Sequence, residues 1–159
     1  MAKALYAGSF DPFSKGHLDI AVRGTRLFEE VIIVVATNTS KKGLFSAKEK
    51  VGLIKEVVKD YSKISVLEHS GKLTADLANE LDTTVLLRGV RTVKDYEYEY
   101  EIALMNKVQN ENLETVILFA DEKYRHISSS LIKEVAKLNG TVEPFLPSII
   151  NTAIKKKFE

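Results

Sequence analysis

The segment most informative about the fold is Ala4-Leu5-Tyr6-Ala7-Gly8-Ser9-Phe10-Asp11-Pro12-Phe13-Ser14-Lys15-Gly16-His17. It begins with an apolar run of strand length, continues with a loop that contains glycine and proline, and leads into a segment of helical periodicity. A strand that passes through such a loop into a helix predicts the first unit of a parallel α/β fold. Ligands of these folds bind beyond the carboxyl ends of the strands, and this loop is therefore the first part of a candidate site.

The same alternation continues along the chain. Apolar runs rich in Val and Ile predict strands at residues 4–7, 31–36, 64–67, 85–87 and 116–119. A first helix is predicted from the apolar face of Leu18, Ala21, Val22 and Phe28. A second begins at the capping box of Ser46 and Glu49 and has the apolar face Val51, Ile54, Val58 and Tyr61. Further helices are predicted at residues 73–81, 95–110 and 129–138, the last of these ended by Gly140, and a final helix begins at Pro147. The alternation predicts an α/β fold, a doubly wound five-stranded parallel sheet with helices on both faces.

Length and composition indicate one domain, residues 1–159. The chain has 159 residues, 45% of them hydrophobic and 28% charged, with no cysteine and three histidines. Disulfides and thiolate sites are excluded, and no protein-held metal site is expected. The formal net charge of +1 argues against nucleic acid as a partner. No apolar run approaches the roughly 20 residues of a membrane span, and we expect a cytoplasmic protein with no signal peptide and no membrane contact.

The first loop carries residue types that suit a phosphate. Gly8 and Ser9 directly after a strand let the backbone and a hydroxyl approach a phosphate closely. His17 begins the next helix, where the positive end of the helix dipole favours the neutral imidazole, and its one N–H can stabilise charge on a phosphoryl oxygen. The alternative is an Asp-Pro turn followed by an ordinary N-terminal histidine.

Two further loops at the same edge carry a cation and hydroxyls. Lys41 lies on a short loop from which an ammonium can reach a phosphate, with a solvated lysine as the alternative. Ser128, Ser129 and Ser130 stand at the start of a helix, where they favour an anion such as a polyphosphate. A plain N-cap is the alternative and needs only one of these hydroxyls.

A fourth loop brings an arginine to this edge. Arg88 directly follows the strand at 85–87 and offers a planar fork that suits phosphate. The alternative is an ion pair of this segment with Asp95 or Glu97.

The helix at 95–110 is acidic and aromatic. Helical spacing places one apolar stripe on each of two sides: Tyr96, Tyr100 and Leu104 on the first, and Tyr98, Ile102 and Met105 on the second. Such a helix is expected to be buried between its own sheet and a partner subunit, which predicts a homo-oligomer. Glu99 lies between the stripes, where it can bind a ligand or form a surface salt bridge.

Two segments carry a family resemblance. Ser14-Lys15-Gly16-His17 and Ile127-Ser128-Ser129-Ser130 resemble the (H/T)-x-G-H and I-S-S-[ST] motifs of the nucleotidyltransferase superfamily. Within it the chain is similar to the bacterial phosphopantetheine adenylyltransferase family along essentially its whole length, including residues 6–12, 40–42, 87–91, 95–99, 105–106 and 127–134. Ser14 replaces the His or Thr of the first motif but keeps a hydroxyl.

The resemblance implies an activity and a set of functional residues. It implies a Rossmann-like nucleotidyltransferase fold, a homohexamer and a requirement for Mg²⁺. The implied reaction is the transfer of AMP from ATP to 4′-phosphopantetheine by direct attack of the acceptor phosphate, which gives dephospho-coenzyme A and pyrophosphate. By this resemblance His17 is catalytic, and 4′-phosphopantetheine is bound by Ser9, Lys41, Thr74 and Arg88. The residues that it implies for ATP are Ser9, Phe10, His17, Gly89, Val90, Arg91, Glu99, Tyr124, Arg125, His126, Ile127, Ser128, Ser129 and Ser130. His17, Lys41 and Arg88 are expected to surround one phosphorus.

Two other functions are alternatives. A sister enzyme can use the same machinery on nicotinate mononucleotide or glycerol phosphate, although residues 88–91 and the acidic helix favour phosphopantetheine. A regulatory domain can hold ATP without turning it over, but it does not need three cationic or polar groups at one phosphoryl centre. ATP binding without pyrophosphate release would favour the regulatory domain.

Overall fold

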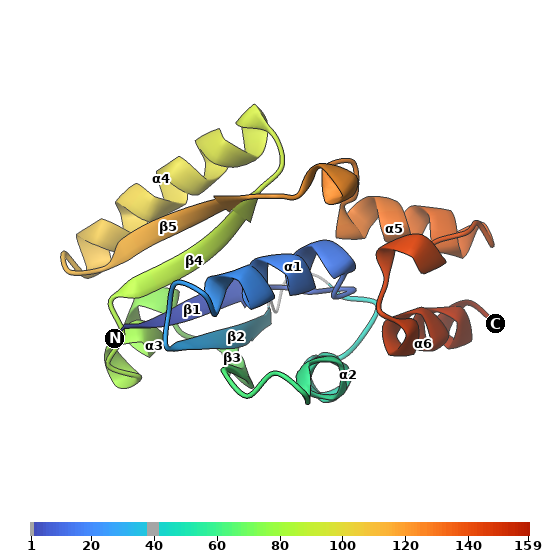
Figure 1. The fold of residues 1–159 in the computed structure, drawn as a ribbon, viewed down its shortest axis with the longest axis horizontal. Coiled ribbons are helices and arrows are strands. Elements are labelled where there is room, and N and C mark those ends of the chain that lie inside the picture. The colour runs from blue at the N-terminus through green and yellow to red at the C-terminus, as the bar shows by residue number, and fades with distance from the viewer. Residues whose placement is uncertain (1, 38–41) are drawn as a thin grey trace.

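The computed structural model describes residues 2–37 and 42–159, and in these residues five parallel strands alternate with helices (Figure 1). The strands are β1 (Lys3–Gly8), β2 (Glu30–Thr37), β3 (Ile64–Ser70), β4 (Val85–Val90) and β5 (Glu114–Phe119). The helices are α1 (Lys15–Gly24), α2 (Ala47–Val58), α3 (Thr74–Glu80), α4 (Val93–Gln109), α5 (Ser129–Lys137) and α6 (Ser148–Phe158), with short 3-10 turns at Glu122–Tyr124 and Glu143–Phe145. The predicted fold class is confirmed. Across the described ranges, every helix is too short or too polar to cross a membrane.

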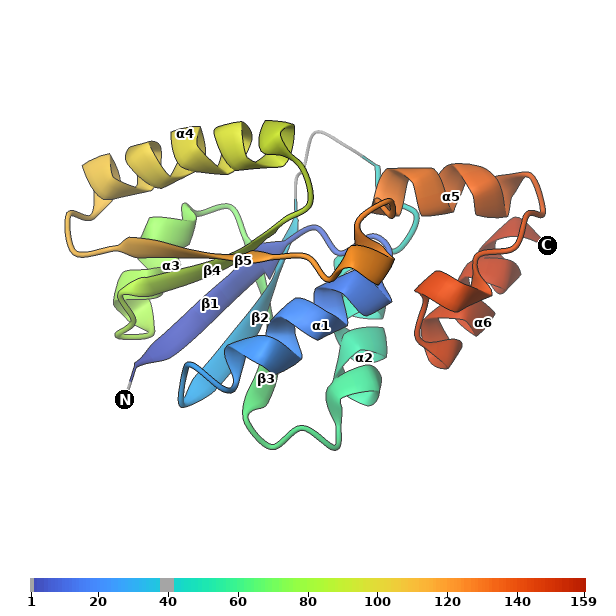
Figure 2. The same cartoon turned by 45° about the horizontal axis from the view of Figure 1, so that its top comes forward.

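The order of the strands creates a switch point at the middle of the sheet. The order is β3-β2-β1-β4-β5, so the chain first winds outward from β1 to β3 and then returns to β4 on the other side of β1. Helices α1 and α2 cover one face of the sheet, whereas α3 and α4 cover the other (Figure 2). The carboxyl ends of β1 and β4 are therefore neighbours at the point where ligands of open α/β sheets bind.

Alternate residues of β1 belong to two different cores. Tyr6 lies in the larger core with Ile20 of α1 and Ile54 of α2, and Leu5 lies in the smaller core with Leu77 of α3. Each fully buried side chain of this size contributes about 1.5–3 kcal/mol of transfer free energy. Because both faces are covered, the strands are apolar throughout, as their sequences indicated.

The buried faces of the first two helices differ from the prediction. Helix α1 ends at Gly24 and buries Ile20 and Ala21, so Phe28 lies beyond it. The predicted capping box of Ser46 and Glu49 does start α2. The fully buried positions of α2, however, are Lys50, Ile54 and Val58, which are spaced by four residues and therefore share one face. Tyr61 follows the helix, and Val51 is only partly buried.

The end of α5 also differs in detail from the prediction. Asn139, with a φ of +57°, adopts the left-handed conformation after the helix, and the N–H of Gly140 donates to the carbonyl of Val135 at 2.9 Å. This is a Schellman motif with asparagine at the left-handed position. Gly140 has another role, because a Cβ there would lie 2.5 Å from Cγ1 of Val135.

Candidate active site

Two cavities open at the switch point on opposite faces of the sheet. The first, which we call the cleft, has a volume of about 820 Å³ on the α3 and α4 side and is lined by Ser9, Thr74, Arg88 and Tyr98 among others. The second, which we call the serine pocket, has about 130 Å³ on the α1 side and is lined by His17, Gly89, Tyr124 and the start of α5. Residues on β1 and β4 alternate between the two, since successive side chains of a strand point to opposite faces.

The loop after β1 has an unusual backbone that its aromatic residues stabilise. Phe10 has a φ of +48°, a conformation that costs a bulky residue about 1–3 kcal/mol. Its ring is buried edge-on against Tyr6, Phe13 and His17, with centroids 5.1–5.4 Å apart. A Cβ on Gly8 would lie 3.0 Å from the Phe10 ring, so glycine is needed there for the ring to lie over the end of the strand. These contacts therefore hold the Phe10 ring over the end of β1.

The contacts of His17 determine its tautomer. The backbone N–H of Ser14 donates to Nδ1 of His17 at 3.0 Å, while the Ser14 hydroxyl accepts from the His17 backbone N–H at 3.3 Å. Because Nδ1 accepts, the proton of the neutral ring is on Nε2. This capping box also explains how serine can stand at the first motif position: the contact needs only a hydroxyl.

His17 is neutral at physiological pH. Burial and, after it, the positive charges of Arg88 and Arg91 lower the pKa of His17 to about 4. The expectation of a neutral ring is confirmed, but the causes are desolvation and two arginines rather than the helix dipole alone.

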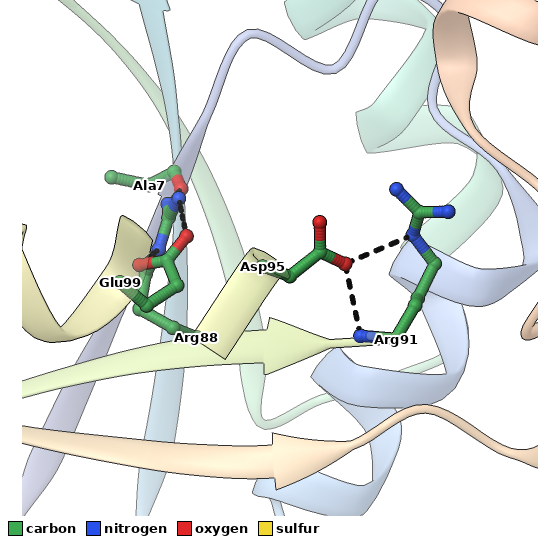
Figure 3. A network of polar contacts seen from close by, with 5 residues as sticks. All are labelled: Ala7, Arg88, Arg91, Asp95 and Glu99. Carbon is green, nitrogen blue, oxygen red and sulfur yellow. Dashed lines mark hydrogen bonds and ion pairs between the residues drawn. The ribbon is translucent and has the colours of Figure 1, made fainter. Parts of the chain in front are cut away.

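Arg88 forms a buried ion pair with Glu99, and not with Asp95 or Glu97, the partners that the sequence suggested. Its Nε and Nη2 donate to the two carboxylate oxygens of Glu99 at 2.7 and 2.6 Å, and Nη1 donates to the carbonyl of Ala7 (Figure 3). Glu99 is only 5% exposed, so this is not a surface salt bridge. The nearby pair of Arg91 with Asp95 is partly exposed, with Nε and Oδ2 3.6 Å apart. Glu99 thus fixes the guanidinium of Arg88 at the wall of the cleft.

The residues predicted to bind ATP are distributed over neighbouring surfaces. The serine pocket is lined by His17, Gly89, Arg91, Tyr124, Ile127, Ser128 and Ser129. A third cavity, of about 540 Å³, shares Arg91 and Ala120 with the serine pocket and is also lined by Val90 and Arg125. Ser9 faces the cleft, Phe10 is buried in the loop, and Glu99 is bound to Arg88. His126 and Ser130 line none of these three spaces.

The residues predicted to bind the acceptor lie together, as far as they are described. Ser9, Thr74 and Arg88 all line the cleft. Lys41 lies outside the described residues. His17 and Arg88 were expected to surround one phosphorus, but they line separate cavities: His17 lies on α1, which covers one face of the sheet, and the Arg88 side chain of β4 lies on the other face. A reacting phosphorus would have to lie over the edge between the two.

Comparison with known proteins shows the family of this chain. The model of the cytidylyltransferase-like family matches residues 5–135, which include both motifs, most of β1 and all of β2 to β5. The chain belongs to the cytidylyltransferase-like family. A phosphopantetheine adenylyltransferase from Latilactobacillus sakei subsp. sakei (strain 23K) is 44% identical over 156 residues, which cover 98% of this chain and 94% of that protein. This member of the cytidylyltransferase-like family is accordingly a nucleotidyltransferase.

Two buried polar residues of this cytidylyltransferase-like protein had no role in the prediction. Asp11 accepts hydrogen bonds from the N–H groups of Leu44 and Phe45 at 2.8 and 3.0 Å and pairs with Lys133 of α5 at 3.2 Å. It thereby ties together the loop after β1, the loop before α2, and α5. Lys50 occupies a position in the buried stripe of α2. The sequence contained a signal for this, because Lys50 is spaced by four residues from the apolar Ile54. The predicted apolar face of this helix missed it.

The pKa of His17 predicts a pH dependence of stability. Its ordinary value in an unfolded chain is about 6.5, against about 4 in the folded protein. Between these values the unfolded chain binds a proton that the folded protein does not bind, so the free energy of unfolding falls as the pH falls. Urea unfolding should therefore show a smaller loss of stability between about pH 7 and about pH 5 for His17→Gln than for the wild type. Equal losses would contradict the lowered pKa.

Proposed function

We propose that the chain transfers the adenylyl group of ATP to 4′-phosphopantetheine, giving dephospho-coenzyme A and pyrophosphate, in the coenzyme A pathway of the cytoplasm. The observation that carries the proposal is the pair of cavities back to back at the switch point, one with Arg88 and one with a neutral His17. The 44% identity to a phosphopantetheine adenylyltransferase supports the choice of acceptor over the sister reactions.

The proposed reaction is a direct displacement at the α-phosphorus. A phosphate oxygen of 4′-phosphopantetheine forms the new P–O bond, and the bond from the α-phosphorus to the leaving pyrophosphate breaks. Arg88, with its fork oriented by Glu99, and Ser9 hold the acceptor phosphate at the end of the cleft, and Lys41 contributes a further charge. The Nε2–H of His17 donates to an α-phosphate oxygen, where negative charge is stabilised in the transition state. Catalysis therefore comes from alignment and electrostatics.

The start of α5 is proposed to bind the β- and γ-phosphates. Ser128 Oγ accepts from the N–H of Leu131 at 3.1 Å, and its own proton is free for a phosphate. Ser129 Oγ donates to the carbonyl of Pro12 at 2.9 Å, so its hydroxyl positions the helix against the first loop. The unpaired backbone N–H groups of the first turn add donors and the positive end of the dipole.

Mg²⁺ is proposed to enter with the nucleotide. Magnesium is usually held by substrate phosphates and one or two carboxylates rather than by a cage of protein ligands. The described residues contain no group of three or more His, Asp or Glu side chains that would form such a cage. The lining of the serine pocket, with hydroxyls, an imidazole and an arginine, fits an ion carried on the phosphates. When bound, it would neutralise part of their charge.

We also propose a homohexamer, on the basis of α4 and the family resemblance. Tyr98, Met105 and Val108 of α4 are 60%, 61% and 77% exposed, although the sequence predicted burial on two sides. Apolar side chains gathered on one helix in this way mark an interface. Light scattering in solution measures the number of subunits.

Pyrophosphate release tests the proposed reaction. Purified protein is supplied with ATP, Mg²⁺ and one of three acceptors: 4′-phosphopantetheine, nicotinate mononucleotide or glycerol phosphate. Of the three acceptors, we expect only 4′-phosphopantetheine to give pyrophosphate release. Release with another acceptor would identify a sister enzyme, and ATP binding without release would favour the regulatory domain.

A further inference from the structure

Lys50 is a buried cation to which the proposed reaction gives no role. It is 7% exposed in the buried stripe of α2, and it lies beside the rings of Phe10, Phe13 and Phe45. Its Nζ donates to the carbonyl of Ser9 at 2.9 Å. Among residues 2–37 and 42–159, no carboxylate lies within ion-pair distance of this ammonium. Burial of a charge without a counter-charge is costly, which points to a role other than stability.

The contact with Lys50 determines which way one peptide faces. The Ser9–Phe10 peptide is trans, and the C=O and N–H of a trans peptide point in opposite directions. Since the Ser9 carbonyl points toward α2 and Lys50, the Phe10 N–H points away from α2. No described residue accepts a hydrogen bond from this N–H. Ser9 itself lines the cleft, so the peptide that carries this free donor lies at the wall of the cleft, at the carboxyl edge of the sheet.

We propose that Lys50 is a positioning residue that holds the Ser9–Phe10 peptide with its N–H, and not its C=O, toward the phosphoryl site. The role rests on the proposed function, since it assumes that phosphates bind at this edge. A flipped peptide would present a carbonyl oxygen to the phosphates and replace attraction by repulsion. Phe10 has a left-handed φ, which is unfavourable for a bulky residue, so the local backbone does not by itself favour the observed orientation of the peptide. The Lys50 ammonium supplies, from α2, a contact that holds it.

Replacement of the ammonium by an apolar side chain of similar length tests the role. We expect Lys50→Met to fold with a melting temperature close to that of the wild type, because it removes a buried unpaired charge together with one hydrogen bond. Its affinity for ATP and its kcat/KM should fall by about 10-fold to 100-fold, whereas Lys50→Arg, which keeps charge and donor, should recover most of both. Lys48→Met is the matched control. It removes the same charge from an exposed position of the same helix, and should leave both unchanged.

ATP binding, measured by calorimetry without an acceptor, separates this inference from the proposed reaction. If the wild type binds ATP but releases no pyrophosphate with 4′-phosphopantetheine, the reaction is wrong, and the loss of ATP affinity in Lys50→Met still tests the inference. Wild-type ATP affinity and wild-type kcat/KM in a folded Lys50→Met variant would overturn the positioning role. Loss of the same size in Lys50→Arg would overturn it too.

The Phe10 amide gives a readout that does not require Lys50→Met to fold. In wild-type protein labelled with ¹⁵N-phenylalanine, the Phe10 N–H resonance, assigned with Phe10→Leu, should shift downfield when ATP is added. In Lys50→Arg the same shift should appear. A Phe10 resonance that ATP leaves in place in the wild type would overturn the inference, since the N–H would then have no ligand.

Discussion

A His17→Ala variant turns over about 100-fold to 1,000-fold more slowly than the wild type, while its affinity for ATP stays nearly the same. Removal of one preorganised donor to a developing charge has an effect of this size. The donor here is preorganised, because the Ser14 N–H holds Nδ1 and leaves the proton on Nε2. The lowered pKa of about 4 keeps the ring neutral, so it contributes a directed N–H rather than a net charge. Single-turnover kinetics and calorimetry measure the two quantities.

The control for His17 is a side chain that keeps a donor. Glutamine can place an amide N–H near the position of Nε2, and we expect His17→Gln to recover part of the lost rate. The variants should share similar melting temperatures, since both lose the same contact from the Ser14 N–H. If His17→Ala loses ATP affinity and rate by the same factor, His17 is only a ground-state ligand and the proposed transition-state role is wrong.

An Arg88→Ala variant loses stability and acceptor affinity together. It leaves the buried Glu99 carboxylate without its partner, which is expected to lower the free energy of unfolding by about 3–5 kcal/mol. It also removes the guanidinium charge and its remaining N–H donors from the wall of the cleft, so the affinity for 4′-phosphopantetheine should fall by more than 10-fold. The affinity for ATP should fall less, because the serine pocket lies on the other face of the sheet. Urea unfolding and calorimetry report the two losses.

A double variant separates the two effects of Arg88. In Arg88→Met with Glu99→Leu the buried charges are both replaced by apolar side chains, which is often neutral for stability. We expect this variant to unfold at close to the wild-type urea concentration but to remain deficient in acceptor binding. If restored stability brings back the acceptor affinity, or if ATP affinity suffers more than acceptor affinity in either variant, Arg88 is not the anchor of the acceptor phosphate.

The strands and loops of this chain were predictable because their signals are local. The five strands lie where apolar runs of strand length stand, and Ser46 with Glu49 starts α2 as its spacing indicated. The positions of Ser9 and Ser128 at the carboxyl edge follow from their place just after a strand or before a helix, whereas Arg88, predicted to follow its strand, lies within β4. The partner of Arg88 did not follow in this way. Glu99 is one helical turn beyond the predicted Asp95, and only the way α4 lies over the sheet selects it.

The α/β class, the loops that form the site and the family could be predicted from the residues alone, because periodicity, capping and ordered motifs are properties of neighbouring residues. The pairing of β1 with β4, which makes the ends of these strands neighbours, is a property of the folded sheet. The packing of the helices also determines which face of the sheet each side chain meets, and so places His17 and Arg88 in different cavities and turns Lys50 toward Ser9. Such pairings depend on the packing of elements far apart in the chain, where a shift of one residue reverses the face.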